Sequence, residues 1–178
     1  MRNGLCLALS LVLTPCVALA QGRLADPATT HVRARSVMAA HLIDEATNRS
    51  AIVRALVQRL DASDIVAYVS IDMLAPPGQR GRLTIIGHAG GRRYVDIKVT
   101  RINDRRAELA SLAHELQHAA EVAAAPEAVD QPSLDRLYRR IGFNVSDKRR
   151  YESHAALKVG EAVFRELADG AAAAVDGR

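Results

Sequence analysis

Apolar residues recur at intervals of three and four along several stretches of the chain, and this spacing predicts α-helices. The predicted helices cover residues His31–Ile43, Ser50–Leu60, 104–125, 133–142 and Asp147–Ala168. Asn103 or Asp104 can cap the third helix, which should stop before Pro126. Ser133 is the expected cap of the fourth, and Gly142 its end.

A different pattern, short and rich in β-branched residues, predicts strands between the second and third helices. Ile65–Ile71 reads as a buried strand, while Arg82–Ile86 and Tyr94–Val99 flank the glycine-rich turn 87–91 and predict a β-hairpin. We therefore expect an α+β fold: a mostly helical single domain in which a small antiparallel sheet, the hairpin plus one strand, packs on the long third helix.

The first 20 residues are typical of a secretory signal peptide. Arg2 precedes an apolar run, and the small residues of Ala18-Leu19-Ala20 form a cleavage site. Thr14-Pro15 interrupts the run well short of the roughly 20 apolar residues that a membrane span needs. We expect residues 21–178 to be a single domain in the periplasm or secreted, with no membrane span. A lipid anchor through Cys16 is a weaker alternative.

Composition narrows the function further. Both cysteines, Cys6 and Cys16, belong to the predicted signal peptide, so the mature chain would have neither a disulfide nor a thiolate ligand. Arg2 is the only charge lost with that peptide, which takes the net charge from +4 to about +3. So mild a charge, with few aromatic residues to stack on bases, argues against a nucleic-acid partner. Because the mature chain would lack a thiolate ligand, any metal must be held by histidine and carboxylate.

The predicted long helix contains His114-Glu115-Leu116-Gln117-His118, an H-E-x-x-H pattern. Residues four apart share a helix face, so His114 and His118 can direct their imidazoles at a single ion. Glu115 lies beside them, where it can take a proton from a zinc-bound water that attacks a carbonyl and pass it to the leaving amine. The alternative is a solvent-facing His-Glu-His stripe on an ordinary helix.

With its apolar flanks, the segment Leu112–Ala119 resembles the active-site helix of the zincin metallopeptidases. The resemblance implies that His114 and His118 bind Zn²⁺ and that Glu115 is the catalytic base. The metzincin extension is absent, because Glu121 and Ala124 stand where its glycine and third histidine belong. The chain is therefore similar to the gluzincins, in which the third ligand is a carboxylate.

Two glutamates compete for the place of that third metal ligand. Glu152 is expected near the start of the last helix, whose small residues would let it pack close to the motif, as in a gluzincin; its structural alternative is a first-turn glutamate favoured by the helix dipole. Glu121 follows His118 by three residues and shares its face. It can reach the ion, orient a ligand histidine, or stay solvated. We favour Glu152.

A peptidase also needs a donor for the oxyanion and a place for the substrate backbone. The candidate donors are Tyr94, Tyr138, Tyr151 and His154, and we favour His154 as catalytic because it stands two residues from Glu152. The half-exposed strand Tyr94–Val99 can receive an extended peptide by strand addition. The other histidines are expected to be structural or solvated: His31 and His41 on the first helix and His88 in the hairpin turn.

The sequence thus predicts an exported zinc metallopeptidase that acts on a peptide or protein substrate through a zinc-bound water activated by Glu115. One alternative is a catalytically inactive zincin-like binding or scaffold protein of the cell envelope, since the small size leaves little chain for a substrate-binding subdomain. Another is a zinc amidase that acts on cell-wall crosslinks. Phosphate-loop, dinucleotide-binding and G-x-S-x-G motifs are absent from the sequence.

Overall fold

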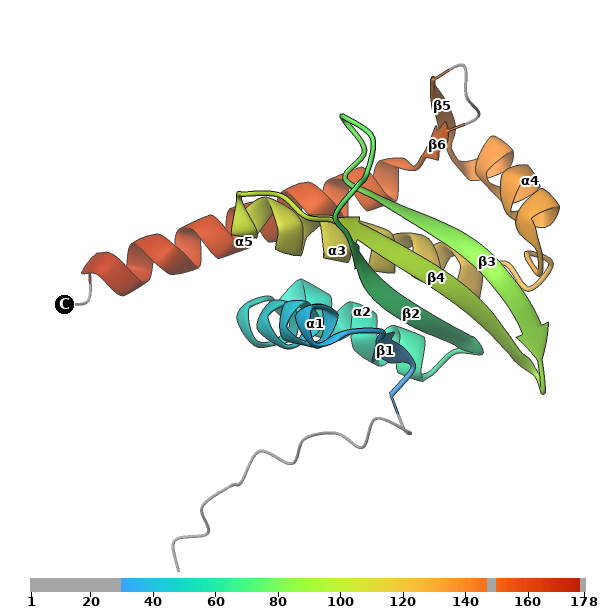
Figure 1. Cartoon of the computed structure of the whole chain (residues 1–178), viewed down its shortest axis with the longest axis horizontal. Helices are drawn as coiled ribbons and strands as arrows, with labels where there is room; N and C mark the ends of the chain where they lie inside the picture. Colours follow the sequence, from blue (N-terminus) through green and yellow to red (C-terminus); the bar gives the residue numbers. More distant parts are fainter. Residues whose placement is uncertain (1–29, 147–149, 177–178) are drawn as a thin grey trace, which may run out of the picture.

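A four-stranded mixed sheet and the long helix α3 form the centre of the computed structural model, which describes residues 30–146 and 150–176 (Figure 1). The predicted signal peptide and both cysteines lie outside these residues. In chain order the elements are β1 (Val32–Ala34), α1 (Val37–Arg49), α2 (Ala51–Asp61), β2 (Ile65–Asp72), β3 (Gly81–Ala89), β4 (Arg92–Thr100), α3 (Arg105–Ala123), α4 (Gln131–Ile141), β5 (Phe143–Ser146), β6 (Arg150–Glu152) and α5 (His154–Asp176). The predicted α+β fold is confirmed.

The central sheet has the strand order β1-β2-β4-β3. β1 pairs with β2 and β2 with β4 in parallel, while β3 and β4 form the predicted antiparallel hairpin. β4 alternates strictly, with Arg93, Val95, Ile97 and Val99 buried on one face. This strand lies between β2 and β3, so the prediction that Tyr94–Val99 receives a peptide is wrong, because both of its backbone edges are already paired. The open edge next to it belongs to β3.

The hairpin turn is shorter than predicted. β3 and β4 continue to Gly90 and Gly91, whose positive φ angles of 57° and 73° suit the tight turn of a twisted hairpin. His88 therefore lies in β3, paired with Arg93, and not in the turn. A bulge between Ile85 and Gly87 interrupts the ladder, and it lets the long arms follow the curvature visible in Figure 1.

Helix α3 passes through the core and is buried on most sides. Its cap is Asp104, whose carboxylate accepts hydrogen bonds from the amides of Arg106 and Ala107. Leu109, Leu112 and Leu116 are fully buried within the core that α3 shares with the sheet and the other helices. Helix α5 lies alongside α3 and extends past the rest of the fold (Figure 1). Among the described residues, no helix is long and apolar enough to cross a membrane.

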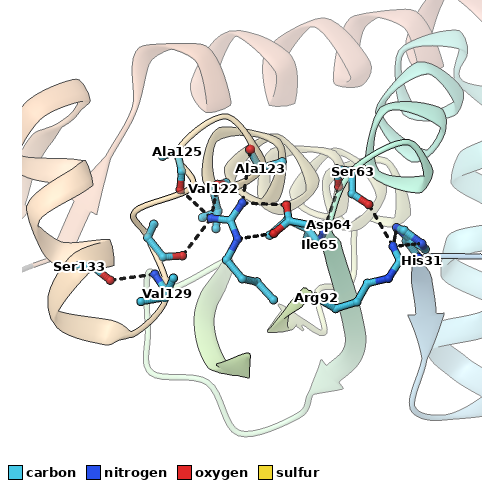
Figure 2. A network of polar contacts seen from close by, with 12 residues as sticks. His31, Ser63, Asp64, Ile65, Arg92, Val122, Ala123, Ala125, Val129 and Ser133 are labelled. Carbon is cyan, nitrogen blue, oxygen red and sulfur yellow. Dashed lines mark hydrogen bonds and ion pairs between the residues drawn. The ribbon is translucent and has the colours of Figure 1, made fainter. Parts of the chain in front are cut away.

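The C-terminal end of α3 is tied to the sheet by Arg93, which is only 4 % exposed. Its guanidinium donates to both carboxylate oxygens of Asp64, at 2.7 and 2.8 Å. It also donates to the carbonyl oxygens of Val122, Ala125 and Ala128 at 2.6–3.0 Å. Figure 2 shows carbonyls of this helix end turned toward the guanidinium that Asp64 binds. A cation here adds hydrogen bonds to carbonyls at and just beyond the helix end, and it complements the helix dipole.

The first helix was predicted to begin at His31, which is earlier in the sequence than the observed start of α1. Ser36 caps α1 by accepting a hydrogen bond from the amide of Ala39, so the helix starts at Val37. The preceding residues form β1 and extend the sheet, which places His31 just before a strand and not on a helix. The buried ring of His31 has Nδ1 2.8 Å from the carbonyl of Leu60 and lies against Arg92 (Figure 2). This is a structural role, as predicted.

The C-terminal part differs most from the prediction. Asp130, and not Ser133, caps α4; Ser133 completes a reciprocal capping box with it. The last helix does not begin at Asp147, because the antiparallel pair β5–β6 occupies this part of the chain and α5 starts only at His154. Glu152 is therefore the last residue of a strand and not part of a helical first turn.

Candidate metal centre

Three side chains converge at the surface of α3. The Nε2 atoms of His114 and His118 are 3.1 Å apart, and Oε1 of Glu152 lies 3.1 Å from the first and 3.0 Å from the second. The two histidines are on one face of α3, and β6 brings the glutamate to them from 34 residues away. This cluster of two nitrogens and one oxygen could hold a metal ion.

The second nitrogen of His118 is held from the opposite side of the ring. Nδ1 donates to Oε2 of Glu121, 2.9 Å away, and the hydroxyl of Tyr138 lies 2.9 Å from the same nitrogen and donates to the carbonyl of His118 at 3.4 Å. A proton on Nδ1 leaves the lone pair of Nε2 directed at the cluster. The arrangement thus fixes the tautomer that a metal ligand requires.

The cluster is also tied to the start of α5. The hydroxyl of Ser153 donates to Oε1 of Glu121 at 2.6 Å and accepts from the amide of Ala156 at 3.0 Å, which caps the helix. The amide of Ser153 donates to Oε1 of Glu152. Glu121 therefore joins His118 to the segment that carries Glu152. In the sequence, Ser153 is followed by a helix-forming run. This pattern indicates a helix that begins at His154 and does not include Glu152.

Glu115 lies beside the cluster and is 4 % exposed. Burial raises the pKa of this carboxyl, although the charges of His118 and His114 oppose the change. Its Oε2 is buried without a hydrogen-bond partner among the described residues. The backbone of Gly81, at the start of β3, packs directly on the Glu115 carboxylate, and a Cβ at that position would collide with it. The sequence analysis missed this role of Gly81, because nothing local marks a contact across the fold.

The protonation of the cluster follows from its contacts. Burial alone would lower the pKa of His118, but the hydrogen bonds to Glu121 and Glu152 outweigh it and raise that pKa to about 10. Burial would raise the pKa of Glu152, yet the two histidines lower it well below its ordinary value. Without a metal, these carboxylates therefore favour a protonated His118, and a metal ion would have to displace the proton on Nε2 in order to bind there.

Two cavities flank the cluster, and His114, Glu115, Glu152 and Gly81 line both. The larger has a volume of about 670 Å³ and extends between α3 and α5. The smaller, about 250 Å³, lies toward α4 and β6 and is lined by Tyr138, Tyr151 and several polar side chains. Substrate-sized space is thus present on both sides of Glu115.

The candidate oxyanion donors separate clearly in space. Tyr94 lies on the sheet face away from the buried valines of β4 and stacks on Tyr68. Tyr138 is buried behind His118. His154 is exposed, with its ring 4.8 Å from that of Phe143, and lines neither cavity. Tyr151 alone of the four is a half-buried residue that faces a cavity together with the cluster.

Comparison of the chain with protein-family models, with curated proteins and with solved structures returned no match.

Proposed function

We propose that this protein is a zinc-dependent peptidase whose site consists of His114, His118, Glu152 and Glu115. The observation that carries the proposal is the triangle of Nε2, Nε2 and Oε1 atoms with sides of 3.0–3.1 Å. Tetrahedral ligands at the usual zinc distances stand about 3.4 Å apart. Each side is also within hydrogen-bond distance, so the support for a metal comes from the convergence of three possible ligand atoms on one place.

The donor set supports zinc more than other ions. Two imidazoles and one carboxylate are the ligands of many catalytic zinc sites, which leave a fourth position open for substrate or water. Calcium and magnesium prefer sites made of oxygen atoms. When bound, a zinc ion polarises a carbonyl oxygen and makes water more acidic.

The protein groups around the cluster have separate tasks in this proposal. Glu115 is buried and faces both cavities, and its Oε2 has no hydrogen-bond partner in the part of the chain that the structure describes, so it can accept a proton from water and return it to the leaving amine. Tyr151 takes the place that the sequence analysis gave to His154, as donor to the developing oxyanion. The outer edge of β3, unpaired within the described residues, offers backbone groups to an extended substrate.

Export remains part of the proposal on the grounds of the N-terminal sequence, which places the peptide or protein substrates outside the cytoplasm. In such a compartment a centre built only of histidine and carboxylate is insensitive to thiol oxidation, unlike a centre that uses cysteine.

The test combines metal content with hydrolysis. The purified protein should contain about one zinc per chain, and Glu115→Gln should keep the metal but lose at least about a hundredfold in turnover of a peptide library. Glu127→Gln, at an exposed glutamate paired with Arg140, is the matched control and should behave as wild type. Failure to bind zinc when it is supplied contradicts the proposal. Zinc binding without any hydrolysis, identical in wild type and Glu115→Gln, would favour a binding protein instead.

A further inference from the structure

The larger cavity continues from the metal centre as a groove between α3 and α5. On each helix its lining residues follow the spacing of a single face. They are Ala107, Ala110, Ser111 and His114 on α3, and Leu157, Gly160, Glu161 and Phe164 on α5. The groove therefore runs along the helices, with His114 at one end and Ala107 at the other.

The dimensions of the groove indicate how much ligand it holds. His114 and Ala107 are separated by seven helical residues, which corresponds to about 10 Å along the axis. An extended peptide rises about 3.3 Å per residue, so roughly three residues fit along this length. The volume of about 670 Å³ is too large for one side chain and suits a short segment.

The lining selects for apolar side chains. Ala107, Ala110 and Gly160 give it a floor of small residues, and Phe164 and Leu157 form its wall. Leu157 is 39 % exposed, so its side chain leaves apolar surface on this wall that a ligand can cover. Away from Glu115 and Glu152, the charged residues of the lining are Arg80, Glu161 and Arg165, and they are exposed, so their charges remain in solvent. The smaller cavity on the other side of Glu115 is more polar.

We propose that the groove binds an extended segment of about three apolar residues on one side of the scissile bond, an inference that rests on the proposed peptidase function. A peptide is the occupant because the groove is continuous with the open edge of β3: Gly81, the first residue of that strand, lines the groove and contacts Glu115. Past Gly81 this edge runs along the smaller cavity, which Arg82 and Leu83 help to line, so a peptide backbone can pair there and continue past Glu115 into the groove. The substrate is thus apolar on the α3–α5 side and small or polar on the other side.

Binding to the metal-free full chain tests this separately from catalysis. Two blocked tripeptides, leucine-phenylalanine-leucine and serine-glutamine-serine, are titrated into ¹⁵N-labelled protein with a chelator present. The apolar peptide should bind at least about tenfold more tightly and shift the amide signals of Ala110 and Gly160. Equal affinity of the two peptides, or shifts confined to other residues, would overturn the proposal, whether or not the zinc-loaded protein cleaves peptides.

Variants locate the binding. Ala110→Phe fills the groove, and Leu157→Asp, at an exposed position that tolerates charge, puts a carboxylate on its wall. Each should weaken the apolar peptide about tenfold or more. Ala155→Phe, at an exposed alanine of α5 outside the groove, is the control and should have no effect. N-octanoyl-glycine amide offers an acyl chain of similar length, and tighter binding of this probe than of the apolar peptide would contradict a peptide occupant.

Discussion

Glu121 holds His118 from behind: its Oε2 accepts a hydrogen bond from Nδ1 at 2.9 Å, while Nε2 of the same ring faces His114 and Glu152. The carboxylate is thus a positioning group and not one of the three converging ligands.

Glu121→Gln should therefore weaken zinc binding by about 10–100-fold, because the amide keeps the shape but loses the charge that orients and polarises the imidazole. Glu152→Gln should weaken it more, since it removes a direct ligand. Competition with a chromophoric chelator measures both affinities, and Glu127→Gln is again the surface control. A larger loss in Glu121→Gln than in Glu152→Gln would reverse the two assignments.

Gly81→Ala should damage catalysis while it spares the metal. The added Cβ collides with the carboxylate of Glu115 and must displace it from its buried position. We expect zinc content to stay near one per chain and kcat/KM to fall about tenfold or more. Gly170→Ala is the matched control, because a Cβ at that position meets no atom within 4 Å. Unchanged kinetics in Gly81→Ala would mean that Glu115 does not act from the position it has here.

Tyr151→Phe should lower kcat by about 10–100-fold and leave KM nearly unchanged, as expected when a hydrogen bond forms only in the transition state. Tyr94→Phe serves as the control, since that ring stacks on Tyr68 across the sheet from the site. If His154→Ala causes the kinetic defect and Tyr151→Phe does not, the role returns to the residue first favoured from the sequence.

Arg93→Met should destabilise the fold by about 1–3 kcal/mol, the cost of leaving a buried polar group without its hydrogen-bond partner. It removes the donor to the Ala128 carbonyl, whereas the carbonyls of Val122 and Ala125 keep their hydrogen bonds from backbone amides. Urea denaturation gives the free energy of unfolding for comparison with Arg82→Met, at an exposed position. Equal stability of the two variants would show that the helix end does not depend on this cation.

Low pH should remove part of the stability that the ion pair of Arg93 and Asp64 contributes. The hydrogen bond from Arg93 lowers the pKa of Asp64, so the ionised form stabilises the folded state above the unfolded pKa of about 3.9 and loses this effect as the pH falls through the folded value. Asp64→Asn should cost about 1 kcal/mol at pH 7, a modest figure because the carboxylate is 39 % exposed. The difference from wild type should shrink near pH 3; a difference that stays constant would assign it to shape and not to charge.

Local sequence predicted most of the helices, and it failed where the structure depends on distant contacts. Asp104 caps α3 and the pattern of leucines keeps it helical, so the motif helix was predictable. The strands β5 and β6 are short and have no strong hydrophobic period. The helix predicted from the apolar spacing of α5 was therefore wrongly extended back to Asp147. Glu152 does lie beside His114 and His118, but it does so as the last residue of β6 and not on the helix that was the reason for favouring it. Gly81 and Ser153 act through contacts across the fold, which no local pattern records.

A bound ion would also act as a covalent crosslink does. His118 and Glu152 belong to segments separated by 34 residues, with α4 and the β5–β6 pair between them. Joining these segments removes conformational freedom from the unfolded chain, as a disulfide around the same loop would. A protein whose described part contains no cysteine would in this way obtain its crosslink from the metal. Its melting temperature should then rise with free zinc concentration.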